Sequence, residues 1–283
     1  HPISNEIQGV EYVRANLMSQ EGARVAARDT DVFVMAAASS SGAAVMANNP
    51  LAHLVPNVVM NGLTMESCLE AGVGKYCFIS SNTVYPPSEE PMNEGDASGE
   101  FFSSYEVVAE MKLFSEKMAE FFSTKSSTPM DTLVIRPGNL YGPKDKFEDG
   151  KSKVIPALIK RAVGREDPFS VWGDGRDIKD FLYIDDFIEA LTIAISQESK
   201  FDVLNIASGQ SVPLKDVIEK ILRISGNASA KLEFDESKPS MIPVRRIDIS
   251  RATQQLGWTP KVDLESGLRK TIDWYKSIIQ EKV

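Results

Sequence analysis

The stretch KYCFISSNTVYP (75–86) decides the fold class, because a short apolar run ends there in a row of polar side chains. The run KYCFISS (75–81) has the length and the aromatic and β-branched content of a buried strand. The residues from Ser80 to Thr83 then supply hydroxyl and amide groups at the end of that strand. Such groups can bond a substrate hydroxyl or carbonyl. Taken alone, an ordinary serine-rich turn is the commoner explanation.

Runs of the same kind recur along the chain and alternate with helical patterns. The expected strands are VEYV (10–13), DVFVMAA (31–37), KYCFISS (75–81), DTLVIRP (131–137) and FDVLNIA (201–207). The expected helices cover about 50–71, 104–123 and 154–163, and the second repeats apolar residues at three- and four-residue spacing. That alternation predicts an α/β protein with a largely parallel sheet.

The pattern changes after NLYGP (139–143), where a charged loop leads into a helix and the turn WGDGRD (172–177). We expect a Rossmann-like doubly wound parallel sheet from 1–143 with 178–208. A smaller C-terminal α/β module would comprise 144–177 with 209–283. This module would fold over the carboxyl edge of the sheet, where open α/β sheets bind their ligands.

Composition excludes several classes of function. The 283 residues carry a formal net charge of −9, which disfavours a nucleic-acid binder, so an anionic ligand would need a local basic pocket. Two histidines leave almost nothing for a histidine metal site or a Ser-His-Asp relay, and no metal is expected. Cys68 and Cys77 are expected to be inert core thiols. Without a membrane-length apolar run or a signal peptide, a cytoplasmic protein is expected.

Phosphate-binding glycine motifs are absent from this sequence. No G-x-G-x-x-G or G-x-x-G-x-x-G follows a strand, and GKS (150–152) lacks the earlier glycine that a phosphate loop needs. What remains is Ala36–Ala38 after the second strand, where small residues let a cofactor approach the backbone, although helix packing explains them equally well. Asn139 follows the fourth strand, and Trp172 and Lys179 add an aromatic face and a cation.

The order of these motifs resembles the extended short-chain dehydrogenase/reductases of the NAD-dependent epimerase/dehydratase family, and most closely their GDP-L-fucose synthase branch. The likeness rests on AAA (36–38), ISSNTVYP (79–86), RPGNLYGP (136–143) and VWGDGRDIKDFLYIDD (171–186). It implies NAD or NADP as cofactor, a nucleotide-diphosphate sugar as substrate and a homodimer formed through helices near 50–71 and 104–123. It also implies that the family's glycine-rich segment would precede His1.

The resemblance transfers catalytic roles unevenly. Ser81 matches the serine that polarises the sugar oxygen, and Lys112 matches the lysine of a Tyr-x-x-x-Lys pair, but Val108 stands where the tyrosine belongs. Tyr105 lies seven residues before Lys112, about 10 Å along a helix, and is the candidate replacement if that stretch is a loop. Lys153 replaces a histidine general acid of the GDP-L-fucose synthase pattern.

The family's ligand contacts transfer residue by residue. The implied cofactor-binding positions are Asn16, Leu17, Ala36, Ala37, Ala38, Asn57, Ser80, Lys112, Pro137, Asn139 and Leu140. The implied substrate-binding positions are Ser81, Thr83, Asn139, Lys153, Val154, Arg161, Trp172, Lys179 and Arg245. The leading hypothesis is therefore an NAD(P)-dependent nucleotide-sugar epimerase, dehydratase or reductase. The alternative is a family member that binds a nucleotide sugar or a protein partner without turnover, because of Val108.

Overall fold

The computed structural model describes residues 7–40, 49–148, 152–237 and 242–280. Its main sheet has four parallel strands in the order β1-β2-β3-β7. The first elements are α1 Gln20–Ala27, β1 Val32–Met35, η1 Pro50–His53, α3 Leu54–Ala71, β2 Lys75–Ile79, η2 Asn82–Val84, η3 Glu94–Asp96, α4 Glu106–Thr124 and β3 Asp131–Pro137. The later elements are β4 Asn139–Tyr141, α5 Val154–Val163, β5 Phe169–Trp172, β6 Ile178–Tyr183, α6 Ile184–Ser196, β7 Phe201–Ile206, β8 Ser211–Pro213, α7 Leu214–Ser225, β9 Leu232–Asp235, α8 Ser250–Leu256 and α9 Leu264–Gln280.

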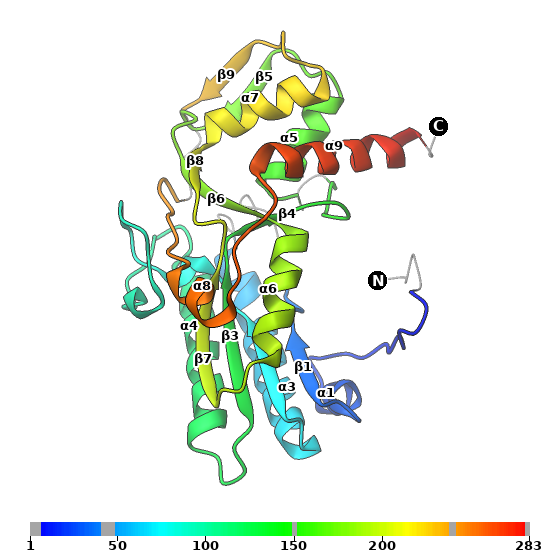
Figure 1. The fold of residues 1–283 in the computed structure, drawn as a ribbon, viewed down its shortest axis with the longest axis vertical. Coiled ribbons are helices and arrows are strands. Elements are labelled where there is room, and N and C mark those ends of the chain that lie inside the picture. The colour runs from blue at the N-terminus through cyan, green and yellow to red at the C-terminus, as the bar shows by residue number, and fades with distance from the viewer. Residues whose placement is uncertain (1–6, 41–48, 149–151, 238–241, 281–283) are drawn as a thin grey trace.

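Helices cover both faces of the main sheet, as the predicted doubly wound architecture requires (Figure 1). Alternate residues of each strand point to opposite faces, so Cys77 and Leu133 pack under α6 and α8. Tyr76 and Phe78 pack under α1, α3 and α4 on the other face. Both cysteines are buried and carry free thiols.

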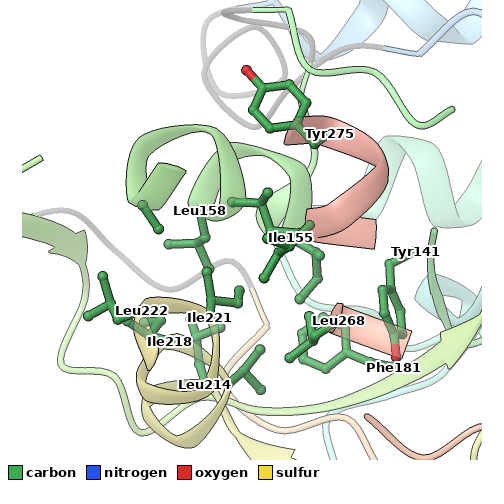
Figure 2. Packing of buried hydrophobic residues seen from close by; sticks show 14 of the residues in the cluster. Tyr141, Ile155, Leu158, Phe181, Leu214, Ile218, Ile221, Leu222, Leu268 and Tyr275 are labelled. Carbon is green, nitrogen blue, oxygen red and sulfur yellow. The ribbon is translucent and has the colours of Figure 1, made fainter. Parts of the chain in front are cut away.

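A second hydrophobic core lies beyond the carboxyl edge of the sheet. It is built from α5, α7 and α9 with β5 and β6, and Figure 2 shows Ile155, Ile218, Ile221 and Leu268 interdigitating there. The chain enters this region directly after β3, through β4, and a two-stranded pair of β5 and β9 lies at its far end (Figure 1). The C-terminal segment therefore packs at the edge where the sheet's parallel strands end.

Most of the predicted elements are confirmed, with one clear error. The segment VEYV (10–13) forms no strand, and Val10 and Val13 are about half exposed. A turn from the Val10 N–H to the Ile7 carbonyl (3.1 Å) bends the chain instead. The β-branched run has no neighbouring strand among the described residues, and β propensity yields a strand only where a partner exists.

The expected apolar stripe of the helix near 104–123 faces two ways in α4. Met111 is buried against the sheet, whereas Phe114 and Phe121 are 54% and 46% exposed. Small and polar residues such as Ala109, Ser115 and Ala119 fill the buried face instead. This arrangement brings α4 close to the sheet and leaves large apolar side chains on its outer face.

Candidate functional site

Three neighbouring strands end at the same level, and their following residues form the candidate site. Met35 lies opposite Phe78, and Ile79 lies opposite Ile135. The polypeptide therefore leaves β1, β2 and β3 at one edge of the sheet. The residues that follow there are Ala36–Ala38 after β1, Ser80–Thr83 after β2 and Gly138–Asn139 after β3.

Ser81 is half-buried at this edge and is held by its neighbour. Its Oγ accepts hydrogen bonds from the Thr83 N–H at 3.2 Å and from the Thr83 Oγ1–H at 3.0 Å, so it acts as the N-cap of η2. Both bonds use Ser81 as an acceptor, which leaves the Ser81 hydroxyl proton available to donate to a bound oxygen. The two residues that were expected to contact the sugar are therefore in contact with each other.

Lys112 extends from α4 to the end of β2. Its Nζ donates a hydrogen bond to the Ile79 carbonyl at 2.8 Å and lies 4.7 Å from the centre of the Phe78 ring. Burial lowers the pKa of Lys112 to about 8; the nearby Lys153 charge lowers it as well, and the Glu116 carboxylate partly offsets both effects. The Lys112 amine is therefore close to its titration point under mildly alkaline conditions.

The helical geometry of α4 separates Tyr105 from Lys112. Helix α4 begins at Glu106, so Val108 and Lys112 are one helical turn apart and Tyr105 is the residue that precedes the helix. Seven residues at 1.5 Å each place Tyr105 about 10 Å from Lys112 along the axis. Burial also raises the pKa of the Tyr105 phenol, which disfavours its role as a proton acceptor.

Asn57 fixes the backbone that follows β1. Its Oδ1 accepts from the Ser39 N–H and its Nδ2 donates to the Ser39 carbonyl, both at 2.9 Å, while Nδ2 also donates to the His53 carbonyl at 2.6 Å. Asn57 is buried. These bonds direct the Asn57 amide to Ser39, so its support for Ala36–Ala38 comes through backbone geometry. The three alanines themselves are exposed.

The end of β3 approaches β6 closely at Gly138. A Cβ on Gly138 would lie 2.8 Å from Oδ1 of Asp180, and the Asn139 Nδ2 donates to the Asp180 carbonyl at 2.8 Å. The Pro137 carbonyl accepts from Asn82 Nδ2 at 2.8 Å, which joins the ends of β2 and β3. Asn139 and Leu140 are half-buried.

Asn16 and Leu17, which were predicted to bind the cofactor, lie before α1. Asn16 is exposed and forms a turn in which its carbonyl accepts from the Ser19 N–H at 3.0 Å, and Leu17 packs on the core under α1 and α3. Helix α1 precedes β1 directly in the chain, and in Rossmann-type sheets the helix before a strand commonly runs antiparallel to it, which is the arrangement we expect here. That arrangement would put Asn16 and Leu17 at the same end of the sheet as Ala36–Ala38, so their cofactor contact stays a prediction.

Ser80 differs from Ser81 because its hydroxyl points into the core. The Ser80 Oγ donates to the buried Glu116 carboxylate, and Arg136 forms a bidentate ion pair with the same carboxylate at 3.1 and 2.6 Å. No sequence motif predicted Glu116 or Arg136 as residues of the site. The available signal was a charged residue one helical turn after Lys112, and an arginine within the apolar run DTLVIRP.

Two of the predicted cations lie near each other at the C-terminal side of the site. The Lys179 Nζ pairs with Asp177 at 3.1 Å and donates to the Ile242 carbonyl. Arg245 is only 2% exposed, and its two terminal nitrogens donate to the Tyr85 and Pro86 carbonyls at 3.0 and 3.1 Å. Burial lowers the pKa of Arg245 to about 10, and burial together with the Arg245 charge lowers that of Lys179.

The other predicted substrate residues are spread over the C-terminal segment. Arg161 forms a bidentate pair with Glu166 and stacks on Phe169, so its guanidinium is engaged within the protein. Trp172 ends β5 and is 56% exposed. Lys153, at the N-cap of α5, and Val154 are exposed. Arg161 belongs to α5 and Trp172 to β5, both in the C-terminal segment, whereas Ser81 and Lys112 belong to the main sheet and its helix α4.

Metal-ligand clusters and membrane-length helices are both missing from the described part of the chain. Within residues 7–40, 49–148, 152–237 and 242–280, no group of three or more His, Cys, Asp or Glu could hold a metal ion. None of the helices in these ranges is long and apolar enough to cross a membrane.

Several named proteins are similar to this chain in sequence. Putative GDP-L-fucose synthase 2 of Arabidopsis thaliana is 31% identical over 265 residues, covering 90% of this chain and 79% of the relative. GDP-L-fucose synthase 1 of the same plant is 32% identical over 258 residues, covering 88% and 78%. The GDP-L-fucose synthase of Escherichia coli (strain K12) is 28% identical over 263 residues, covering 87% and 80%.

Solved structures establish the fold. The UDP-glucose 4-epimerase of Thermotoga maritima with UDP-glucose aligns with a TM-score of 0.84 at 22% identity, covering 98% of this chain and 89% of that one. The UDP-glucose 4-epimerase of Thermus thermophilus in complex with NAD gives the same TM-score and identity, covering 97% and 88%. The profile of the NAD dependent epimerase/dehydratase family matches residues 3–207. This protein therefore belongs to the NAD dependent epimerase/dehydratase family, with a Rossmann-type extended short-chain dehydrogenase/reductase fold.

Proposed function

We propose that this protein binds a nucleoside-diphosphate hexose and NAD or NADP at the carboxyl edge of β1, β2 and β3. There it would transfer hydride at a sugar carbon, as an epimerase, dehydratase or reductase. The observation that carries the proposal is Lys112, whose ammonium group lies at the end of β2 beside the backbone that leads into Ser81. Proteins similar in sequence are named GDP-L-fucose synthases, which supports a nucleotide sugar as the substrate class.

The side chains at this edge suit a nicotinamide cofactor. The Lys112 ammonium has three N–H donors, and the Ile79 carbonyl accepts one, so ribose hydroxyls can accept others. Exposed Ala36–Ala38 permit close approach of a cofactor to the backbone. Asn16, Leu17 and Asn139 would complete the contacts along the edge. When bound, the cofactor supplies a hydride acceptor or donor, which no side chain provides.

The chemistry then needs a path for one proton. A bound nicotinamide cofactor would take up or return a hydride at the sugar carbon, and the hydroxyl proton would then need an acceptor, or a donor in the reverse direction, from a side chain or from solvent. Ser81 would donate its hydroxyl proton in a hydrogen bond to the sugar oxygen and so orient it. Val108 offers no acid or base, and Tyr105 lies about 10 Å from Lys112 along the axis.

The sugar side would use the C-terminal segment. Lys179 and Arg245 carry two positive charges against the single Asp177 carboxylate paired with Lys179, which favours a diphosphate despite the acidic chain. The exposed Trp172 ring would offer a face to a base or sugar, and Thr83, Lys153 and Val154 would contribute further contacts. In this proposal the segments 144–177 and 209–283 act as the substrate-binding domain.

One observation favours a second candidate function. Val108 occupies the position one turn before Lys112 where a phenol would transfer the proton. A protein that keeps the ligand contacts and lacks this group binds a nucleotide sugar without turning it over. General acid–base groups contribute about 10²–10⁴-fold to rate, so the loss of one separates the two functions experimentally.

The test is turnover of GDP-, UDP- and dTDP-hexoses with NAD(H) or NADP(H), in the wild-type protein and in Val108→Tyr. We expect Val108→Tyr to raise turnover about 100-fold or more. We expect Tyr105→Phe, the matched loss of a phenol, to change it less than about twofold. Binding without turnover in wild type would favour the second function. Absence of nucleotide-sugar binding in both proteins would refute the proposal.

We also propose a homodimer formed through the outer faces of α3 and α4. Leu51 on η1 and Val55 on α3 are 60% and 61% exposed, and Phe114 and Phe121 on α4 are about half exposed. A second copy packed on η1, α3 and α4 would remove these apolar side chains from water. Sedimentation of wild type should give twice the chain mass, and Phe114→Ser with Phe121→Ser should give monomer. A monomeric wild type would contradict this assembly.

A further inference from the structure

Three elements of the candidate site meet at one buried carboxylate. Glu116 on α4 accepts a hydrogen bond from Ser80 after β2 and a bidentate pair from Arg136 on β3. The distances from Arg136 are 3.1 Å for Nε and 2.6 Å for Nη2, and both charged side chains are 5% exposed. Glu116 therefore joins the helix to the ends of two strands.

Each partner of Glu116 stands next to a residue of the proposed site. Ser80 directly precedes Ser81, and Lys112 lies one helical turn before Glu116. Arg136 precedes Pro137 at the end of β3. A shift of the Glu116 carboxylate would therefore move the backbone of Ser81 relative to the Lys112 ammonium, because α4 and β2 are tied together at this point.

The same network extends to the C-terminal side. Arg136 Nη1 donates to the Tyr85 hydroxyl at 3.1 Å, and that hydroxyl donates to Asn205 Oδ1 at 2.5 Å. The Asn205 Nδ2 donates to the Met92 and Asp248 carbonyls at 3.0 Å each. Asp248 lies three residues after Arg245, so the network spans both sides of the site.

We propose that Glu116 is a positioning residue for this site: its carboxylate fixes Ser81 and Lys112 relative to each other and supplies the negative charge that supports the Lys112 ammonium. This inference rests on the proposed function, since it assigns a role within the same site. Glu116 touches neither the substrate nor the cofactor in this account. It acts through Ser80, Arg136 and the electrostatic field at Lys112.

Burial and two charged groups together set the protonation of Lys112. Burial is the main cause that brings its pKa to about 8. Glu116 on the same helix favours the ammonium form, and Lys153 at the start of α5 disfavours it. Replacing Glu116 by glutamine removes the only favourable charge among these causes and should lower the Lys112 pKa further.

The first experiment measures the Lys112 titration directly in the full chain. Reductive ¹³C-methylation labels the lysines for NMR, and the Lys112→Arg spectrum assigns the Lys112 signal. In Glu116→Gln we expect the Lys112 pKa to fall by about one unit. In Glu265→Gln, which removes a carboxylate held bidentately by Arg223 on the surface, we expect no change. An unchanged Lys112 pKa in Glu116→Gln would overturn the proposal.

The second experiment separates positioning from folding. Ser80→Ala removes one hydrogen bond and leaves the Glu116–Arg136 pair intact, so it should fold even where Glu116→Gln does not. We expect Ser80→Ala to lower kcat at least tenfold with KM changed less than about twofold. A normal kcat would overturn the role at Ser81.

The two experiments also distinguish this inference from the proposed function. If the wild-type protein binds nucleotide sugar without turnover, the kcat comparison is made in Val108→Tyr, with and without Ser80→Ala. If the wild-type protein binds no nucleotide sugar, the proposed function fails, whereas the Lys112 titration still reports whether Glu116 supports that charge.

Discussion

Two buried arginines lie against the same tyrosine ring, and they differ in what neutralises them. The Arg136 and Arg245 guanidinium carbons are 5.1 and 5.9 Å from the centre of the Tyr85 ring. Arg136 has the Glu116 carboxylate, whereas Arg245 has two backbone carbonyls and a buried Nε without an acceptor. A buried cation with its own anion is part of the scaffold. A buried cation without its own anion is stabilised when a ligand brings negative charge to it.

The largest expected effect is the loss of stability when Arg136, the arginine with its own carboxylate, is replaced. Arg136→Met leaves the Glu116 carboxylate buried and unpaired, so we expect the free energy of unfolding to fall by about 3–5 kcal/mol. Urea unfolding monitored by circular dichroism measures it. Arg245→Met leaves only carbonyls unpaired and should cost about 1–3 kcal/mol.

The double variant Glu116→Met/Arg136→Met is the control for this prediction. Removing both charges should recover most of the lost stability, because no buried charge then remains unpaired. A double variant as unstable as Arg136→Met alone would show that the ion pair is not what separates Arg136 from Arg245.

Lys112 is a third, partly buried cation, intermediate between Arg136 and Arg245, because the Glu116 carboxylate offsets only part of the cost of burying its charge. The pH dependence of stability tests this. The pKa of Lys112 is lowered from 10.5 to about 8. Below pH 8 the buried amine is charged, and the full cost of burying that charge lowers the free energy of unfolding. That cost is relieved as the pH rises from about 8 towards 10.5, where the unfolded lysine still binds a proton. Ligand-free stability should therefore rise over this range relative to Lys112→Met.

Cofactor affinity should change in the opposite direction over the same range. Loss of the Lys112 ammonium should weaken NAD(P) binding about tenfold between pH 7 and 9.5. Fluorescence titration at a series of pH values measures the dissociation constant. Lys112→Met should bind more weakly and show a flat profile. A wild-type profile that is equally flat would contradict the role of this charge.

The smallest expected effect on stability comes from Asp180, a buried carboxyl group that is not paired with a cation among the described residues. Asp180 is fully buried, its Oδ1 accepts from the Ser208 N–H at 2.8 Å and its Oδ2 has no partner. Burial raises the pKa of Asp180 to about 6, although hydrogen bonds from the Ser208 backbone oppose the shift. Below about pH 3.8 the protonated Asp180 therefore makes its full contribution to the free energy of unfolding. This contribution is lost as the pH rises through 6 and the carboxyl ionises.

Asp180→Asn removes this charge and keeps an oxygen for the Ser208 N–H. We expect it to raise stability by about 1 kcal/mol at pH 8, or about 2 °C in Tm. We expect no gain near pH 4, where the aspartate is already protonated. Scanning calorimetry at both pH values measures the difference, and an equal gain at both would exclude titration of Asp180 as the cause.

Sequence patterns predicted the strands of the sheet well, but they predicted less well where the side chains at the edge of the sheet point. The apolar run 131–137 became β3 with the same bounds, because a fully buried strand has a continuous apolar signal. The segment 10–13 has the same local signal and forms no strand, because a strand also needs a partner. Such partners are set by the fold and cannot be identified from a single local run.

In the candidate site, too, the sequence predicted positions along the chain better than side-chain contacts. The sequence predicted Ser81 as a catalytic residue and Ser80 as a cofactor contact, yet the Ser80 hydroxyl points to the buried Glu116, since alternate residues point to opposite sides. The family resemblance implied Arg245 as a substrate contact but not the carbonyls of Tyr85 and Pro86 that hold its guanidinium. Glu116 carries no motif of its own, because its role depends on three elements distant in sequence.

The most direct test of the account is calorimetric titration of GDP-, UDP- and dTDP-hexoses into the wild-type protein and into Arg245→Met, with Glu265→Gln as control. We predict that at least one of these nucleotide sugars binds the wild type and the control alike, and that Arg245→Met binds it at least tenfold more weakly. Failure of all three to bind the wild type, or equal binding by Arg245→Met, would contradict the central claim that this edge of the sheet receives a nucleotide sugar.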